Sequence, residues 1–155
     1  HQKFSGKDLS VLDTETNEKF LPHVIEPAVG ITRLFFMLLL DSFVEEGEGD
    51  SARSFLKLPK ELAPYRVAVF PLVANKPQLV EKAEELYRSL SDEYAVAWDD
   101  RGNIGKRYRA QDEIGTPFCV TVDYQTLEDG TVTVRNRDTM EQERVKIEEI
   151  TRFIA

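Results

Sequence analysis

Gly30 and Arg33 are the first residues whose types and spacing suit a chemical role. Gly30 ends a strand-like segment, and the apolar run Ile31 to Val44 that follows has the length of a helix. Arg33 falls in its first turn, where backbone N–H groups and the helix dipole favour an anion. A guanidinium adds bidentate phosphate binding and a flat face for stacking on a base. By itself this spacing is more typical of a helix-end arginine in a salt bridge, so both roles stay open.

A second group of cations lies in the segment 101–110, which contains no acidic residue. We expect this segment to surround the start of a short helix, on which Lys106 and Arg109 share a face because they are three residues apart. Arg135 and Arg137 are two residues apart on a strand or its end and can point the same way. Each cation alone is as often a solvated surface residue, but as a set they favour RNA binding. The basic residues of the segment are Arg101, Lys106, Arg107 and Arg109.

The overall charge of the chain does not point to RNA. Its 155 residues carry a formal net charge of −8, which argues against non-specific binding of nucleic acid. The charge is uneven, however: residues 1–50 hold 4 basic and 10 acidic residues, whereas residues 51–155 hold 16 basic and 18 acidic residues. A local cationic surface in the second part is therefore compatible with the sequence.

Cysteine usage indicates a reducing compartment, and the hydrophobic pattern shows no stretch long enough to span a membrane. The single cysteine, Cys119, cannot form an internal disulfide, and its apolar neighbours predict a buried structural thiol. No signal peptide is recognisable, and the apolar stretch Leu34 to Leu40 is too short to span a bilayer. We therefore expect a cytoplasmic protein without a membrane segment. His23 has no partners for a catalytic triad or a metal cluster and is expected to be structural.

The elements before residue 65 form an incomplete unit. We expect a strand or two around Phe4 and Leu9–Leu12, then a helix over Ile31–Val44 that ends near Glu45–Gly47. That helix is apolar on nearly every face, which requires burial that fifty residues cannot supply. Either an N-terminal part or a partner chain is expected to cover it. Acidic, glycine-containing residues then indicate a linker.

From residue 65 onward, strands alternate with helices. This pattern predicts an α/β fold whose parallel strands are joined through helices, with a final hairpin that makes the sheet mixed. The predicted strands are 66–70, 94–98, 118–122, 131–135 and 141–145, and the predicted helices are 77–90, 104–113 and 147–154.

Two blocks of the chain carry a resemblance to a known family. Pro22 to Leu34 resembles motif 3 of class II aminoacyl-tRNA synthetases, and its Val24–Pro27 is similar to the glycyl enzyme in particular. Ile104 to Tyr124 and Thr131 to Gln142 resemble the anticodon-binding domain shared by the glycyl, threonyl, prolyl and histidyl enzymes, with the glycyl branch the most similar. The resemblance covers the chain from about Pro22 to its last residue.

The resemblance implies roles for the first block. Arg33 would contact the γ-phosphate and stack on the base of ATP, which the full-length enzyme binds with Mg²⁺. Glu26 would hold the ammonium group of glycine, and Gly30 would form the turn between them. Ala28 departs from the glycyl pattern, which has serine there, so a hydroxyl that would help hold the amino acid is absent. Such a site works by positioning and charge stabilisation rather than covalent catalysis.

The resemblance also implies contacts with RNA. Arg109 and Arg135 correspond to residues that read anticodon bases in the threonyl relative. Asp123, at the end of a predicted strand, would accept from a cytosine amino group. Arg101, Lys106 and Arg137 complete the set expected to bind the tRNA.

The implied fold is a three-layer anticodon-binding domain, with a mixed five-stranded sheet flanked by helices. It follows a strand–helix fragment of a class II antiparallel-sheet catalytic domain. We expect the catalytic fragment in residues 1–50, a linker in 51–58 and the anticodon-binding domain in 59–155. Motifs 1 and 2 are absent, so the chain alone is expected to be inactive and to hold no bound cofactor or metal.

The implied parent is a glycine–tRNA ligase that acts through glycyl-adenylate on glycine, ATP and tRNA-Gly, usually as a homodimer. Two alternatives remain at this point. One is a non-catalytic paralogue such as the accessory subunit of mitochondrial DNA polymerase. The other is a class II synthetase of threonyl or prolyl specificity.

Overall fold

A computed structural model describes residues 1–49 and 52–155, which fall into two compact units, His1–Leu34 and Phe35–Ala155. Asp50 and Ser51, where the expected catalytic fragment 1–50 meets the expected linker 51–58, lie outside the described residues.

The N-terminal unit contains one turn of helix and one hairpin. Helix α1 covers Gln2–Ser5, and strands β1 (Val11–Leu12) and β2 (Lys19–Phe20) pair antiparallel. The expected strand near Leu9–Leu12 is thus confirmed for its last two residues, whereas Phe4 lies in α1 instead of a strand. No residue of this unit is buried, so it has no core of its own.

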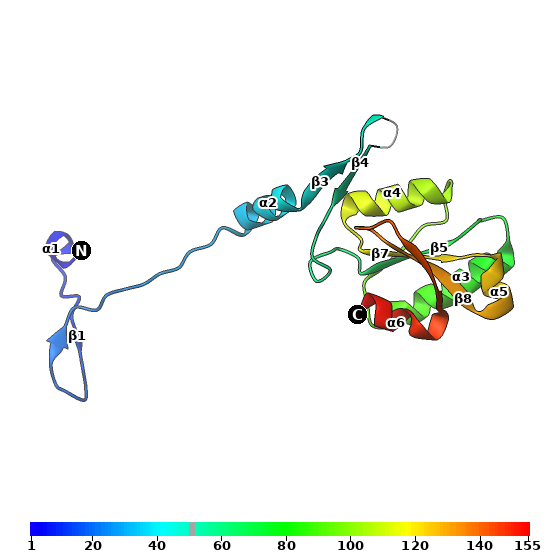
Figure 1. The fold of residues 1–155 in the computed structure, drawn as a ribbon. Helices are drawn as coiled ribbons and strands as arrows, with labels where there is room; N and C mark the ends of the chain where they lie inside the picture. The colour runs from blue at the N-terminus through cyan, green and yellow to red at the C-terminus, as the bar shows by residue number, and fades with distance from the viewer. Residues whose placement is uncertain (50–51) are drawn as a thin grey trace. The chain divides into compact units, whose positions relative to one another are not determined.

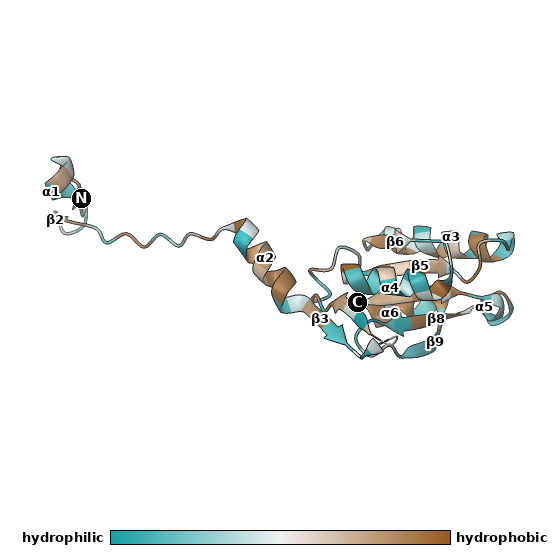
Figure 2. Cartoon of the chain, turned by 90° about the horizontal axis from the view of Figure 1, so that it is seen from above, coloured by the Kyte–Doolittle hydropathy of each residue, from teal (hydrophilic) through white to brown (hydrophobic). Residues whose placement is uncertain are grey.

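Helix α2 (Ile31–Ser42) ends earlier than the apolar run predicts. The next residues form strand β3 (Phe43–Glu46), which pairs antiparallel with β4 (Arg53–Leu56). Residues 53–56 of the expected linker 51–58 are therefore a strand of a hairpin. Most apolar side chains of α2 are exposed, with Phe36 at 61% and Met37 at 64%, and the helix is largely coloured as hydrophobic in Figure 2.

The predicted mixed five-stranded sheet is confirmed (Figure 1). Its strand order is β6-β5-β7-β8-β9, with β6, β5 and β7 parallel and with β7, β8 and β9 antiparallel. Its elements in chain order are β5 (Val67–Pro71), α3 (Pro77–Ser91), β6 (Val96–Trp98), α4 (Ile104–Ile114), β7 (Phe118–Val122), α5 (Tyr124–Asp129), β8 (Thr131–Asn136), β9 (Gln142–Lys146), a 3-10 turn (Ile147–Glu149) and α6 (Ile150–Ile154).

Alternation along β5 divides the core between the two faces of the sheet. Val67 and Val69 point to the face that α3 and α6 cover, where the larger apolar cluster lies. Ala68 and Phe70 point to the opposite face, beneath α4. Since successive side chains of a strand alternate, a strand buried on both faces needs apolar residues at every position. Cys119 belongs to the α4 face and is 1% exposed, which confirms the predicted buried thiol.

Helix α5 was not predicted. Asp123 follows β7 directly and caps this helix: its carboxylate accepts from the Thr126 backbone N–H, while the Thr126 hydroxyl accepts from the Asp123 backbone N–H. Such a capping box stabilises a helix whose six residues carry little periodic signal. None of the helices in the described part of the chain has the length and apolar composition needed to cross a membrane.

Gly115 links the hairpin to the sheet domain. It ends α4 with φ +87°, and a Cβ there would lie 2.8 Å from Leu58 Cδ1 and 3.0 Å from the Leu56 carbonyl oxygen. Only glycine satisfies both the left-handed backbone and the close approach of the segment after β4.

We predict that Gly115→Ala lowers the free energy of unfolding by about 3 kcal/mol, from backbone strain and overpacking together. Gly130→Ala is the matched control, because Gly130 also has a positive φ but open space around its Cβ position. The control should cost only about 1 kcal/mol. Urea unfolding followed by circular dichroism measures both, and equal losses would contradict the close approach.

Candidate functional site

Exposed cations gather where β6 leads into α4. Asn103 caps the helix, and its Oδ1 accepts from the Lys106 backbone N–H at 2.9 Å. Arg101, Lys106 and Arg109 are all exposed, and Lys106 and Arg109 lie three residues apart on α4. Arg101 forms one ion pair, with Asp99 at 3.5 Å. These three side chains are free to meet a polyanion.

Arg107 belongs to the same basic segment but does not share this exposure. Its side chain is 2% exposed and points toward the sheet. The helical repeat explains the difference, because Ile104, Arg107 and Gln111 follow one face of α4, which packs on the sheet.

Arg135 is enclosed by protein. It is 6% exposed, and its two Nη atoms donate to the two carboxylate oxygens of Asp112 at 2.7 and 2.8 Å. Its guanidinium carbon lies 5.0 Å from the ring centre of Tyr108. Burial alone would lower the pKa of Arg135, but the hydrogen bonds and charge of Asp112 raise it above its usual value. Arg53 of β4 shares the same carboxylate at 3.3 Å.

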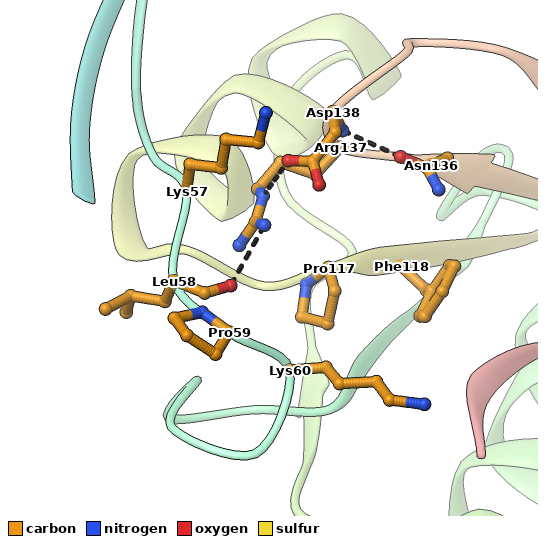
Figure 3. A pocket seen from close by; sticks show the side chains of 9 residues that line it. All are labelled: Lys57, Leu58, Pro59, Lys60, Pro117, Phe118, Asn136, Arg137 and Asp138. Atoms are coloured by element: carbon orange, nitrogen blue, oxygen red, sulfur yellow. Dashed lines mark hydrogen bonds and ion pairs between the residues drawn. The ribbon is translucent and has the colours of Figure 1, made fainter.

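Arg137 is also buried, at 3% exposure. Its Nη1 donates to the Gly115 carbonyl at 2.7 Å, its Nη2 to the Leu58 carbonyl at 3.0 Å and its Nε to Asp138 at 2.8 Å. Figure 3 shows the guanidinium between Leu58 and Asp138, beside a surface pocket of about 310 Å³. Arg135 and Arg137 thus both face the α4 side, as their spacing allows, but both guanidinium groups already donate to protein acceptors.

Asp123 has two roles at the end of β7. Besides capping α5, it accepts from both terminal nitrogens of Arg144 on β9. Burial alone would raise the pKa of Asp123, but the bonds from Arg144 and the Thr126 backbone outweigh this and lower it. The carboxylate is therefore ionised and partnered.

The segment before α2 holds the other expected site residues. Residues 21–30 have no regular secondary structure, and Leu34 N–H donates to the Gly30 carbonyl as the helix begins. Arg33 lies in the first turn of α2. Glu26 and Arg33 are exposed, and within the described residues neither forms a hydrogen bond or ion pair with another side chain. No group of three or more His, Cys, Asp or Glu side chains among residues 1–49 and 52–155 is arranged to hold a metal ion.

Sequence reasoning missed three residues that organise this region: Arg53, Asp112 and Arg144. Asp112 lies on the same helical face as the apolar Ile104 and Tyr108, which was the available signal. Nothing in the sequence indicates that Arg53 would bind Asp112 or that Arg144 would bind Asp123, because the partners lie 59 and 21 residues apart in the chain.

Comparison with protein families gives a specific match. Residues 66–155, which contain the five-stranded sheet, match the family model of the anticodon binding domain. The chain belongs to this family. The exposed cations of α4, the paired Arg135 and the helix-capping Asp123 are thus features of an anticodon-binding domain.

Relatives of the whole chain are similar throughout its length. The glycine–tRNA ligase of Clostridium beijerinckii is 50% identical over 155 residues, which is 99% of this chain and 33% of that protein. The glycine–tRNA ligase of Chlorobaculum tepidum is 48% identical over 155 residues, which is 100% of this chain and 33% of that protein. The chain thus spans about one third of the length of the curated relatives it matches.

Solved structures share the fold of the anticodon-binding domain. A prolyl-tRNA synthetase from Cryptosporidium parvum, complexed with halofuginone and AMPPNP, is 25% identical with a TM-score of 0.59, covering 64% of this chain and 22% of that one. The RNA binding domain of threonyl-tRNA synthetase from Cryptosporidium parvum Iowa II is 25% identical with a TM-score of 0.57, and the match covers 63% of this chain and 24% of that one.

We predict that Asp112→Asn lowers the free energy of unfolding by about 3–5 kcal/mol, because the buried guanidinium of Arg135 loses its countercharge while Arg53 keeps only Glu46. Glu85→Gln is the control, since it breaks an exposed pair with Lys82 and should cost less than about 0.5 kcal/mol. Urea unfolding at neutral pH measures both variants. A loss from Asp112→Asn no larger than that of the control would show that the carboxylate does not hold these elements together.

Proposed function

We propose that the protein is a glycine–tRNA ligase, of which this chain contributes motif 3 and the anticodon-binding domain. The observation that carries the proposal is the identity of about one residue in two with glycine–tRNA ligases over the whole chain, including the segment before α2. This similarity favours the ligase over the polymerase accessory subunit and over threonyl or prolyl specificity.

In the proposed reaction, glycine is activated by ATP before transfer to tRNA-Gly. Arg33 and the N–H groups at the start of α2 suit the triphosphate, because both attract and orient phosphate oxygens. The Glu26 carboxylate suits the glycine ammonium, and Gly30 sets the turn between the two. Mg²⁺ bound with the nucleotide would neutralise part of the phosphate charge. Alone, this chain holds one edge of such a site and is expected to be inactive.

In the proposed RNA complex, Arg101, Lys106 and Arg109 bind the anticodon loop of tRNA-Gly, since they are exposed on one continuous stretch of loop and helix. For Arg135, Arg137 and Asp123, direct contact with the tRNA stays a prediction that requires each side chain to exchange its present partner. We further propose a cytoplasmic homodimer for the full-length protein, as the family resemblance implies.

The catalytic part of the proposal is tested on the full-length protein that contains this chain. We expect ATP–pyrophosphate exchange that depends on glycine, and a decrease of roughly a hundredfold or more in Arg33→Ala from the loss of transition-state charge stabilisation. Arg88→Ala, on the exposed side of α3, should leave exchange unchanged. Absence of exchange would overturn the ligase assignment, and exchange with proline or threonine instead would overturn the specificity.

The RNA part of the proposal is tested on this chain with an anticodon stem-loop of tRNA-Gly. Lys106→Ala and Arg109→Ala should each weaken binding roughly fivefold and reduce the slope of log K against log salt by about 1, because each removes one cation from the RNA. Arg88→Ala is again the control, since it removes the same charge from the opposite face of the sheet. Fluorescence anisotropy over a salt series gives both quantities. Unchanged affinity in both variants would remove this surface from the proposal.

A further inference from the structure

Arg107 is a buried cation whose acceptors are all backbone carbonyls. Its Nη1 donates to the carbonyls of Pro71 at 2.6 Å and Asp99 at 3.2 Å, and its Nη2 to those of Leu72 at 3.1 Å and Gly102 at 3.4 Å. Among the residues that the structure describes, no carboxylate lies within ion-pair distance of it. The side chain therefore joins two backbone segments instead of neutralising a charge.

This arrangement is costly. Burial lowers the pKa of Arg107, while the more distant carboxylates of Asp99 and Asp100 act in the opposite direction. Its Nε has no hydrogen-bond partner among the described residues, and the Phe70 ring centre, 5.6 Å away, is the one aromatic face near it in that part of the chain. An apolar side chain at this position would avoid the cost of removing a charge from water. What the guanidinium contributes instead is a set of hydrogen bonds to four carbonyls in defined directions.

The two segments that Arg107 holds follow β5 and β6, which are neighbouring parallel strands. The second segment, 99–103, is also fastened from within: the Arg101 N–H donates to Asp99 Oδ1 at 2.9 Å, and Asn103 caps α4. Gly102 has φ +69°, a left-handed backbone conformation that favours glycine. This loop carries one exposed cation, Arg101, and leads directly to another, Lys106.

We propose that Arg107 is a positioning residue for RNA binding, which holds the loop 99–103 so that Arg101 and Lys106 are presented to the RNA in one arrangement. The inference rests on the proposed function. Lysine cannot replace Arg107 in this role, because a single ammonium on a flexible stem cannot direct donors to four carbonyls in two segments.

The test compares Arg107→Lys and Arg107→Met with Lys106→Ala in this chain, with the tRNA-Gly anticodon stem-loop as the probe. Both Arg107 variants should weaken binding roughly tenfold, as expected when a residue acts without touching the ligand. Their slope of log K against log salt should equal that of the unmodified chain, because no cation leaves the RNA. Lys106→Ala should instead reduce the slope by about 1.

Gly102→Ala tests the same loop without removing a buried charge. An alanine Cβ there meets no atom within 4 Å, so only the strain of the positive φ disturbs the loop. It should weaken binding with an unchanged salt slope. Gly130→Ala is its matched control, because Gly130 has the same φ of +69° and the same open surroundings but precedes β8, away from these cations. The control should bind RNA as the unmodified chain does.

The outcomes separate this inference from the proposed function. If the unmodified chain does not bind the stem-loop, the RNA part of the proposed function fails and the inference fails with it. If it binds, and Gly102→Ala and the Arg107 variants that keep a native circular dichroism spectrum bind equally well, the inference is overturned while the proposed function stands. A salt slope reduced in Arg107→Lys as much as in Lys106→Ala would also overturn it, since Arg107 would then act as a contact. If Arg107→Met does not fold, Arg107→Lys and Gly102→Ala decide.

Discussion

The buried carboxylate of Asp112 is the interaction on which the arrangement of the second unit depends. Arg135 binds it from β8 with both Nη atoms, and Arg53 reaches it from β4. A helix, a sheet and a hairpin therefore meet at one charge. Glu46 binds Arg53 from the next strand and balances the second guanidinium. Because these bonds are directional and shielded from water, they specify the orientation of the hairpin on α4 more narrowly than apolar contact would.

The two faces of the sheet are stabilised by different interactions, apolar packing on one and hydrogen bonds between buried polar groups on the other. On one face, α3 buries Leu79, Ala83, Leu86 and Leu90, and this apolar contact is tolerant of small shifts. On the other face, the buried positions of α4 include Arg107, Gln111 and Asp112, each with hydrogen-bond partners in defined directions. The polar face is therefore the one that fixes loop geometry, and the exposed cations belong to the helix that lies on it.

This division explains how an acidic chain can offer a cationic surface. Arg107, Arg135 and Arg137 are buried, and their hydrogen bonds hold the domain together. Arg101, Lys106 and Arg109 are exposed on one loop and helix, where their positive charges locally oppose the negative field of the whole chain. A net charge of −8 then limits non-specific attraction while the local cations remain available to a polyanion of the right shape.

The sequence alone predicted the order of the five strands and of helices α3, α4 and α6 in the anticodon-binding domain but missed α5, because the apolar run of β7 and the helical repeat of α3 are local signals that burial enforces. It also identified Cys119 as buried and Lys106 and Arg109 as neighbours on one helix face. Only the tertiary structure decided which arginines are available. Arg101 and Arg107 lie in the same basic segment, yet Arg101 is exposed and Arg107 is buried between α4 and the sheet, because its acceptors are carbonyls at the end of β5 and in the segments that follow β5 and β6. In the same way, the end of α2 at Ser42 follows from the pairing of β3 with β4, which no local pattern records.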